Sequence, residues 1–283
     1  MSEPSKAVLI TGCSSGIGRA SALQLVRSGW KVYATARREE TIADLKDAGC
    51  RTLALDVTDE QAIRVAVDTV EQAEGAVGVL INNAGYSQSG AIETVPLEAV
   101  RRQFETNVLG LVRLTQLVLP KMRAQRWGKI VNVGSMGGRL SFPGGGHYHA
   151  TKHALEAISD ALRFELRGFG IDVILLEPGL IRTEFGEAAT ASMTQIASSE
   201  NDPYGQFNAT VGAVTKGAYD GPMRLLGAGP ERVANVIERA ISRRRPPARI
   251  TITPSAKLTI AARRLLTDRA WDAAMRKQFP QPR

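Results

Sequence analysis

Cysteines and long hydrophobic runs are both scarce in this sequence. Cys13 and Cys50 are the only cysteines among 283 residues. Two are too few for the disulfide framework of a small secreted domain, so a reducing cytoplasm is the natural compartment. No apolar run approaches the roughly 18 residues of a membrane-spanning helix. A strand-like run begins near Lys6 and leaves no room for a signal peptide. We therefore expect a cytoplasmic protein without a membrane span.

Clusters of metal-ligating residues are lacking as well. Neither cysteine lies in a CxxC or Cys/His array, and Glu93, Glu177 and Glu184 do not pair at spacings typical of a metal site or a glycosidase. No metal is therefore expected.

The net charge of +8 is unevenly distributed along the chain. Between Glu231 and Arg283 there are 13 Lys and Arg against 4 Asp and Glu, whereas residues 1–230 hold 23 against 24. A nearly neutral body argues against nucleic acid as a partner. The positive charge belongs to a basic C-terminal extension at 246–283.

Short apolar runs alternate with longer amphipathic stretches over the first 180 residues. Near-continuous β-branched runs are typical of strands buried on both faces of a parallel sheet. The alternation predicts a doubly wound α/β fold in one domain, 1–283. The expected strands lie at 7–11, 32–36, 52–57, 77–85, 129–135 and 171–179, and the expected helices at 16–28, 39–48, 59–73, 97–126 and 148–169.

Residues 184–229 break this alternation. They are mostly small residues without a clear period, which predicts a long loop with short helices. Loops of that length in compact domains are usually functional, so we expect this one to cover a substrate. Its large side chains suit an apolar pocket, although ordinary packing is an equal alternative. They are Phe185, Met193, Tyr204, Phe207, Tyr219 and Met223.

A glycine-rich turn, TGCSSGIG at 11–18, follows the first expected strand. Glycines between a strand end and a helix start let the backbone approach a pyrophosphate, which the helix N-terminus then binds. The spacing TGxxxGxG differs from GxGxxG, and a simple tight turn is the alternative. Because a strand precedes it and a helix follows, the turn predicts a dinucleotide site. The residues expected to form it are Gly12, Ser14, Ser15, Gly16, Ile17 and Gly18.

Two arginines follow the second expected strand, which ends at Ala36. A carboxylate there would bind a ribose 2′-hydroxyl, whereas Arg37 and Arg38 can pair with a 2′-phosphate. A solvated charged loop is the alternative. We expect NADP(H) to be favoured over NAD(H).

Tyr148 and Lys152 are four residues apart, so a helix places both on one face. A phenol has an ordinary pKa of about 10, and a nearby ammonium lowers that pKa by stabilising the phenolate. Ser135 ends a strand, where its hydroxyl could hold a carbonyl or alcohol oxygen. Asn107 could bend its helix and coordinate a water behind Lys152. His149 points to another face than Tyr148, so packing is its simpler interpretation.

Taken together, these motifs resemble the short-chain dehydrogenase/reductase family over at least residues 6–185. They are TGCSSGIG, the NNAG at 82–85, Asn107, Ser135, YHATK at 148–152 and Pro178-Gly179. The resemblance implies a single Rossmann-type domain with about seven parallel strands, and a homodimer or homotetramer. The runs VLITGCSSGIG and VYATAR are further similar to members that act on lipophilic alcohols. Many NADP-preferring members carry a basic residue where Ser15 stands, which leaves the preference to Arg37 and Arg38.

The resemblance also implies roles for individual residues. Asn107, Ser135, Tyr148 and Lys152 would form the catalytic tetrad. Gly12, Gly16, Ile17 and Gly18 would line the pyrophosphate, Asp56 and Val57 the adenine, and Asn82, Ala84 and Gly85 the adenine ribose. Lys152 would also hold the nicotinamide ribose, and Pro178, Gly179, Ile181 and Thr183 would meet the nicotinamide end.

These residues predict an oxidoreductase that moves a hydride between a nicotinamide and the oxygen-bearing carbon of a small, lipophilic substrate. Tyr148 would carry the proton, Lys152 would lower its pKa, Ser135 would fix the substrate oxygen, and Asn107 would support a proton relay. The alternative is a dinucleotide-binding sensor or scaffold without turnover, which the presence of all four side chains disfavours.

The basic extension has helical spacing between Lys257 and Phe279. A basic amphipathic helix can lie on an anionic membrane surface, which would suit an enzyme that draws lipophilic substrates from a bilayer. The alternative is that the apolar face packs on the domain or on a partner subunit while the arginines are solvated. The apolar residues are Leu258, Ala261, Ala262, Leu265, Leu266, Trp271, Met275 and Phe279.

Overall fold

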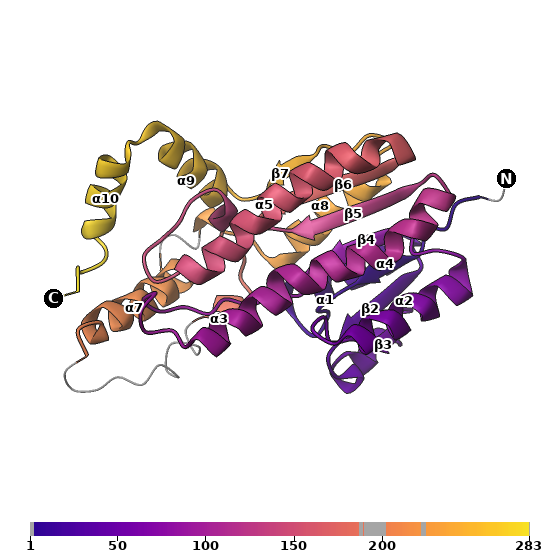
Figure 1. The fold of residues 1–283 in the computed structure, drawn as a ribbon, viewed down its shortest axis with the longest axis horizontal. Helices are drawn as coiled ribbons and strands as arrows, with labels where there is room; N and C mark the ends of the chain where they lie inside the picture. The colour runs from indigo at the N-terminus through magenta and orange to yellow at the C-terminus, as the bar shows by residue number, and fades with distance from the viewer. Residues whose placement is uncertain (1–2, 187–188, 190–201, 222–224, 283) are drawn as a thin grey trace.

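A seven-stranded parallel sheet forms the centre of the molecule (Figure 1). The computed structural model describes residues 3–186, 189, 202–221 and 225–282. The strand order β3-β2-β1-β4-β5-β6-β7 reverses direction between β1 and β4, which confirms the predicted doubly wound α/β fold. The strands are β1 (Val8–Ile10), β2 (Val32–Ala36), β3 (Arg51–Ala54), β4 (Val79–Asn82), β5 (Gly128–Val133), β6 (Ile171–Glu177) and β7 (Arg249–Thr251).

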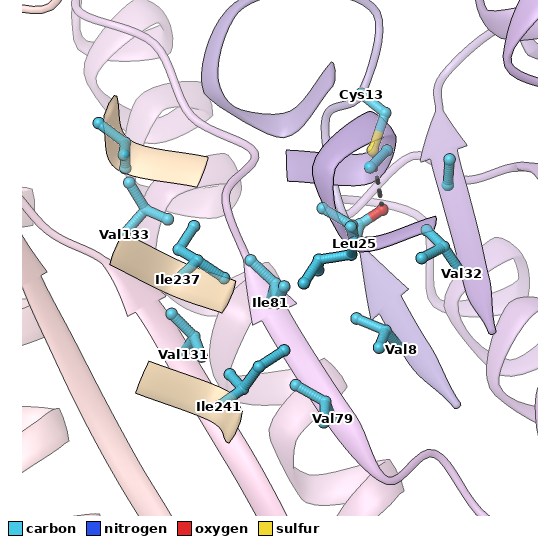
Figure 2. Close-up of a cluster of buried hydrophobic side chains, with 14 of the residues drawn as sticks. Val8, Cys13, Leu25, Val32, Val79, Ile81, Val131, Val133, Ile237 and Ile241 are labelled. Atoms are coloured by element: carbon cyan, nitrogen blue, oxygen red, sulfur yellow. Dashed lines mark hydrogen bonds between the residues drawn. The ribbon is translucent and has the colours of Figure 1, made fainter. Parts of the chain in front are cut away.

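Helices cover both faces of the sheet because the strands are apolar on both sides. Val8 packs into the core beneath α1 (Gly16–Arg27) and α8 (Pro230–Ser242), whereas its neighbour Leu9 packs into the opposite core. Figure 2 shows Ile237 and Ile241 of α8 meeting the strand valines. The opposite core is covered by α2 (Glu60–Glu74), α4 (Gly110–Ala124) and α5 (Gly146–Leu166).

Two expected helices differ from the prediction. Residues Glu39–Leu45 form short 3₁₀ turns instead of an α-helix, with a kink at Ile42, where the backbone is not helical; Ile42 and Leu45 are buried. The expected helix at 97–126 is divided into α3 (Leu97–Phe104) and α4 by a π-helical turn at Glu105–Leu109.

The C-terminal half contains elements that the sequence pattern did not predict. β7 and α8 complete the sheet and its cover, and the expected loop at 184–229 contains a full helix, α7 (Gly205–Asp220). Met193 and Met223 lie outside the described residues. The basic extension, in contrast, was expected to be helical and forms α9 (Pro254–Leu265) and α10 (Asp268–Arg276). Of the helices described, none is both long and apolar enough to cross a membrane.

The carboxyl ends of β1 and β4 are bound together at what we call the β1–β4 junction (Thr11, Gly12, Gly18, Asn83 and Ala84). The Thr11 hydroxyl accepts hydrogen bonds from the backbone N–H groups of Asn83 (3.0 Å) and Ala84 (2.9 Å). The Asn83 amide donates to the carbonyls of Thr11 (2.8 Å) and Gly12 (3.0 Å). A Cβ atom on Gly18 would lie 2.2 Å from the Gly12 carbonyl oxygen. Only glycine therefore lets α1 approach the strand so closely.

We predict that Gly18→Ala lowers the free energy of unfolding by about 1–3 kcal/mol, because the backbone at Gly12 must move to admit a methyl group. Gly217→Ala is the matched control, since Gly217 also lies in a helix but a Cβ there meets nothing within 4 Å. It should be neutral or stabilising by up to about 1 kcal/mol. Urea unfolding of both variants measures the difference, and equal stabilities would contradict a tight junction.

Candidate active site

A large, continuous cavity of about 1560 Å³ runs along the carboxyl ends of the strands. It joins the glycine-rich turn at one end to Ser135, Tyr148 and Lys152 further along. Because the sheet reverses its strand order between β1 and β4, the helices diverge there and leave this opening. The predicted residues that line it are Gly12, Ser14, Ser15, Gly16, Ile17, Arg37, Asp56, Val57, Ala84, Gly85, Ser135, Tyr148, Lys152, Pro178, Gly179, Ile181 and Thr183.

Four predicted residues do not line the cavity: Gly18, Arg38, Asn82 and Asn107. Gly18 instead packs against Gly12 at the β1–β4 junction. The Asn82 amide is buried and donates to the Asn132 side chain (3.0 Å). Its neighbour Asn83, which the sequence analysis did not select, lines the cavity in its place.

The N-terminus of α1 faces the cavity without a capping partner. Ser15 is the N-cap residue, but its side chain makes no capping hydrogen bond, and the first turn holds no acidic residue. The first backbone N–H groups of a helix have no partner within the helix and favour an anion. Ser14, Ser15 and Gly16 line the cavity here, so this end fits the pyrophosphate of a dinucleotide.

Two arginines, which we call the positive region, line the cavity near this end, where Asp56 and Glu105 also line it. Arg37 lines the cavity after β2, and Arg102 of α3 lines it as well. Both side chains affect the pKa of the Tyr86 phenol. Burial raises this pKa, and the two guanidinium groups oppose the rise. Arg102 was missed by the sequence analysis because no motif marks it and the folded chain alone brings α3 beside residue 37.

Ser135 is held in one orientation by its own turn. It precedes the 3₁₀ segment Met136–Gly138, and its Oγ accepts a hydrogen bond from the Gly137 N–H (3.0 Å). One lone pair of the hydroxyl is thereby used, so the hydroxyl hydrogen remains for an oxygen atom in the cavity.

Lys152 is buried beneath Tyr148 on α5. Its Nζ donates to the Val133 carbonyl (2.9 Å) and lies 5.8 Å from the centroid of the Tyr148 ring. Burial lowers the pKa of the Lys152 ammonium to about 8, so the group is still mostly cationic at neutral pH. An ammonium at this distance favours the ionised form of a phenol.

Asn107 lies in the π-helical turn and ties three segments together. Its amide donates to the Tyr86 carbonyl (2.9 Å) and to the Thr151 hydroxyl (3.1 Å), and its Oδ1 accepts from the Tyr86 N–H (3.1 Å). The regular α-helix is interrupted at Asn107, where a bend was expected. With both amide hydrogens used, the side chain positions the loop after β4 against α5.

His149 packs behind the Ser135 turn. Its Nδ1 bonds to the Gly137 carbonyl (3.1 Å), and its ring contacts Tyr148 edge-on with centroids 5.6 Å apart. Burial lowers the pKa of this imidazole from 6.5 to about 4, so it is neutral at physiological pH. Because a carbonyl can only accept, Nδ1 carries the proton.

The far end of the cavity is apolar. Phe185 contacts the Tyr148 ring, with centroids 5.6 Å apart, and α7, α9 and α10 supply most of the remaining wall. Tyr204, expected in a substrate loop, instead donates from its hydroxyl to Glu93 (2.6 Å), and Phe207 packs against the hydrophobic cluster beneath α9 and α10. The apolar lining here includes Phe142, Phe185, Val211, Val214, Leu258, Trp271, Met275 and Phe279.

We predict that His149 makes the protein less stable in mild acid. The unfolded imidazole binds a proton near pH 6.5, whereas the folded one does so only near 4. As the pH falls below 6.5, the unfolded state therefore binds more protons and stability is lost. Between pH 7.5 and 5.5 this residue should cost roughly 1.4 kcal/mol.

Urea unfolding at the two pH values tests this. His149→Asn should reduce the loss of stability between them, whereas His153→Asn, at an exposed site on the same helix, should leave the loss unchanged. An equal pH dependence in the wild type and His149→Asn would contradict the assignment.

Comparisons with known proteins place the chain in a family. The family model described as short chain dehydrogenase matches residues 6–194. Among relatives whose names state a reaction, the 3-ketodihydrosphingosine reductase of Bacteroides thetaiotaomicron is 34% identical over 255 residues, covering 90% of each chain. The NADPH-dependent 3-dehydrocapnine reductase of Ornithobacterium rhinotracheale is 34% identical over 281 residues, covering 96% of each chain.

The similarity extends to solved structures. A short-chain dehydrogenase from Streptomyces avermitilis is 36% identical, with a TM-score of 0.79 over 98% of this chain and 97% of the other. The overall fold described above is thus shared with that protein. The chain is a member of the short-chain dehydrogenase/reductase family and an NAD(P)-dependent oxidoreductase.

Proposed function

We propose that this protein uses NADPH to reduce the ketone of a lipophilic small molecule. The observation that carries the proposal is the continuous cavity, which has the glycine-rich turn and Arg37 at one end, Tyr148 and Lys152 in the middle and an apolar wall at the other end. The names of the two relatives support it, since one specifies NADPH and both denote reductases of a keto or dehydro compound.

Each polar group of the site has a defined role in this proposal. The dinucleotide, when bound, supplies or accepts the hydride. Ser135 donates its hydroxyl hydrogen to the substrate oxygen, and Tyr148 gives that oxygen a proton as the reduction proceeds. Lys152 stabilises the phenolate left behind, and its remaining N–H groups hold the nicotinamide ribose. Asn107 supports the proton relay behind Lys152 by holding the loop after β4 against α5.

The preference for NADPH rests on the positive region. The β2 strand ends in Ala36 rather than a carboxylate, and Arg37 and Arg102 line the cavity beside it. Arg19, another cation near the turn, is paired with Asp44. Arginine binds phosphate strongly and in a defined geometry, so a 2′-phosphate would be favoured here.

The apolar wall supports a lipophilic substrate. Trp271, Met275 and Phe279 line this end of the cavity. A substrate with a long apolar part would be desolvated there, while its polar part would lie against Ser135 and Tyr148. The proposal also includes a homodimer or homotetramer in the cytoplasm, as family membership and the two free, buried cysteines support.

We predict that Tyr148→Phe lowers kcat at least about 100-fold, because the ring remains and only the hydroxyl that carries the proton is lost. NADPH affinity, measured by fluorescence titration, should change by less than about threefold, roughly 0.6 kcal/mol. Turnover is followed by NADPH consumption with a panel of long-chain ketones.

Tyr204→Phe is the matched control, because it removes an exposed hydroxyl bonded to Glu93. It should leave kcat unchanged. More than a tenth of the wild-type kcat in Tyr148→Phe would exclude Tyr148 as the proton donor. Binding of NADPH without turnover across the whole panel would instead favour a sensor.

We predict that Arg37→Ala lowers the preference for NADPH over NADH about tenfold or more, since a charge-assisted bond to phosphate contributes roughly 1.5–3 kcal/mol before screening. Arg38→Ala should change it little, because Arg38 does not line the cavity. The ratio of kcat/KM for the two cofactors measures the preference. If both variants changed the cofactor preference equally, the two arginines would simply belong to a solvated charged loop without a specific contact to the phosphate.

A further inference from the structure

Helix α9 presents two opposite apolar faces. On the inner face, Ala256 and Ile260 are buried together with Trp271 and Met275 of α10, in a cluster that includes Leu140 and Val211. Of the apolar residues expected in the extension, Trp271, Met275 and Phe279 are buried in this cluster, as the alternative of packing on the domain predicts. On the outer face, residues at i, i+3, i+4 and i+7 are exposed, and so is Leu266, which directly follows the helix. We call them the α9 stripe: Leu258, Ala261, Ala262, Leu265 and Leu266.

The leucines of the α9 stripe are unusually exposed. Leu258 is 60% exposed, Leu265 86% and Leu266 38%. Single exposed leucines are ordinary on a protein surface, but a row of apolar side chains along one helix face and its C-terminal end marks a surface that binds something apolar.

Basic side chains flank the α9 stripe. Lys257, Arg264 and Arg269 are exposed, and none forms an ion pair within the described part of the chain. Arg263, by contrast, is paired with Asp268 and packs over the Trp271 ring at 5.6 Å. The segment 254–282 holds six Lys and Arg against two Asp and Glu. The surface therefore suits an apolar partner with negative charge at its boundary.

The same helix forms part of the active-site cavity. Leu258 and Ala262 of the α9 stripe line the cavity together with Thr259 between them. The apolar outer surface is therefore continuous with the apolar wall that leads to Tyr148. A molecule entering along α9 would stay in contact with apolar side chains from the surface to the site.

We propose that the α9 stripe and its flanking basic residues dock onto the surface of an anionic lipid bilayer, so that the cavity opens toward the acyl chains. Amphipathic helices with leucines on one side and lysine or arginine beside them bind at this interface. Anionic headgroups attract the flanking cations, and this attraction is screened by salt. Docking itself does not depend on the proposed reaction, although a lipophilic substrate would give it a purpose.

A second copy of the chain fits this face less well. A two-fold contact apposes the same patch on both subunits. Lys257, Arg264 and Arg269 of one copy would then lie near those of the other, and like charges would oppose the contact.

Vesicle flotation of the full-length protein tests the proposal without cofactor or substrate, so its outcome is independent of turnover. Truncation of the extension is unsuitable, because Trp271, Met275 and Phe279 belong to a hydrophobic core cluster. We expect binding to vesicles of phosphatidylcholine with about one-third phosphatidylglycerol at low salt, about tenfold weaker binding at 0.5 M NaCl, and little binding to pure phosphatidylcholine.

Two variants distinguish the apolar contribution to vesicle binding from the electrostatic contribution. Leu265→Ser with Leu266→Ser should weaken vesicle binding about tenfold or more. Neither residue lines the cavity, so activity on a water-soluble ketone should be retained. The matched control is Phe164→Ser, which removes a side chain 83% exposed on α5 and should leave binding intact.

Lys257→Gln, Arg264→Gln and Arg269→Gln together should abolish the preference for anionic vesicles. Arg243→Gln, Arg244→Gln and Arg245→Gln remove an equal charge from the exposed segment just before β7 and should not. No binding to anionic vesicles at low salt, or equal losses in the two triple variants, would overturn the proposal. A smaller sedimentation coefficient of the leucine variant without vesicles would also overturn it, by assigning the stripe to a subunit interface.

Discussion

The close approach of α1 to the end of β1 is the constraint on which the cofactor end of the site depends. A side chain at Gly18 would collide with the Gly12 carbonyl, so the absence of one lets the helix start directly against the strand. The Asn83 amide then binds the backbone of Thr11 and Gly12 and fixes β4 to the same point. As a result, the uncapped N–H groups of α1 face the cavity, and an anion can bind where the helix and the two strands meet.

A cluster of buried charged side chains holds the Ser135 and Tyr148 end of the site in place in a comparable way. Glu156 lies one turn after Lys152 on α5, and its carboxylate pairs with Arg139 (3.3 Å) and Arg249 (2.8 Å). Burial, and then repulsion from Glu177, raise the pKa of Glu156, and the two arginines oppose both effects. Removing one partner would leave an uncompensated charge in the interior. The cluster thus holds the turn after Ser135 and the strand β7 against the helix that carries Tyr148.

Much of the fold and the catalytic group could be predicted from sequence, because the signals are local. Alternating apolar runs identified six of the seven strands, and the four-residue spacing of Tyr148 and Lys152 placed both on one helix face. β7 was missed since it has only three residues, all half-buried, and depends on pairing with β6. The 3₁₀ segment at Glu39–Leu45 was taken for a helix because both Ile42 and Leu45 also fit a helical period.

The sequence by itself determined the class of fold, the glycine-rich turn and the residue types of the catalytic group, because each is encoded over a few neighbouring positions. Tertiary structure decided which of several adjacent side chains line the cavity and which are buried in the core. Arg37 lines the cavity while Arg38 does not, because only one of two adjacent side chains can point inward from the strand end. The apolar positions of the extension were visible in sequence, but their division between a buried face and an exposed stripe was not. That division depends on where Leu140 and Val211, distant in the chain, meet α9 and α10.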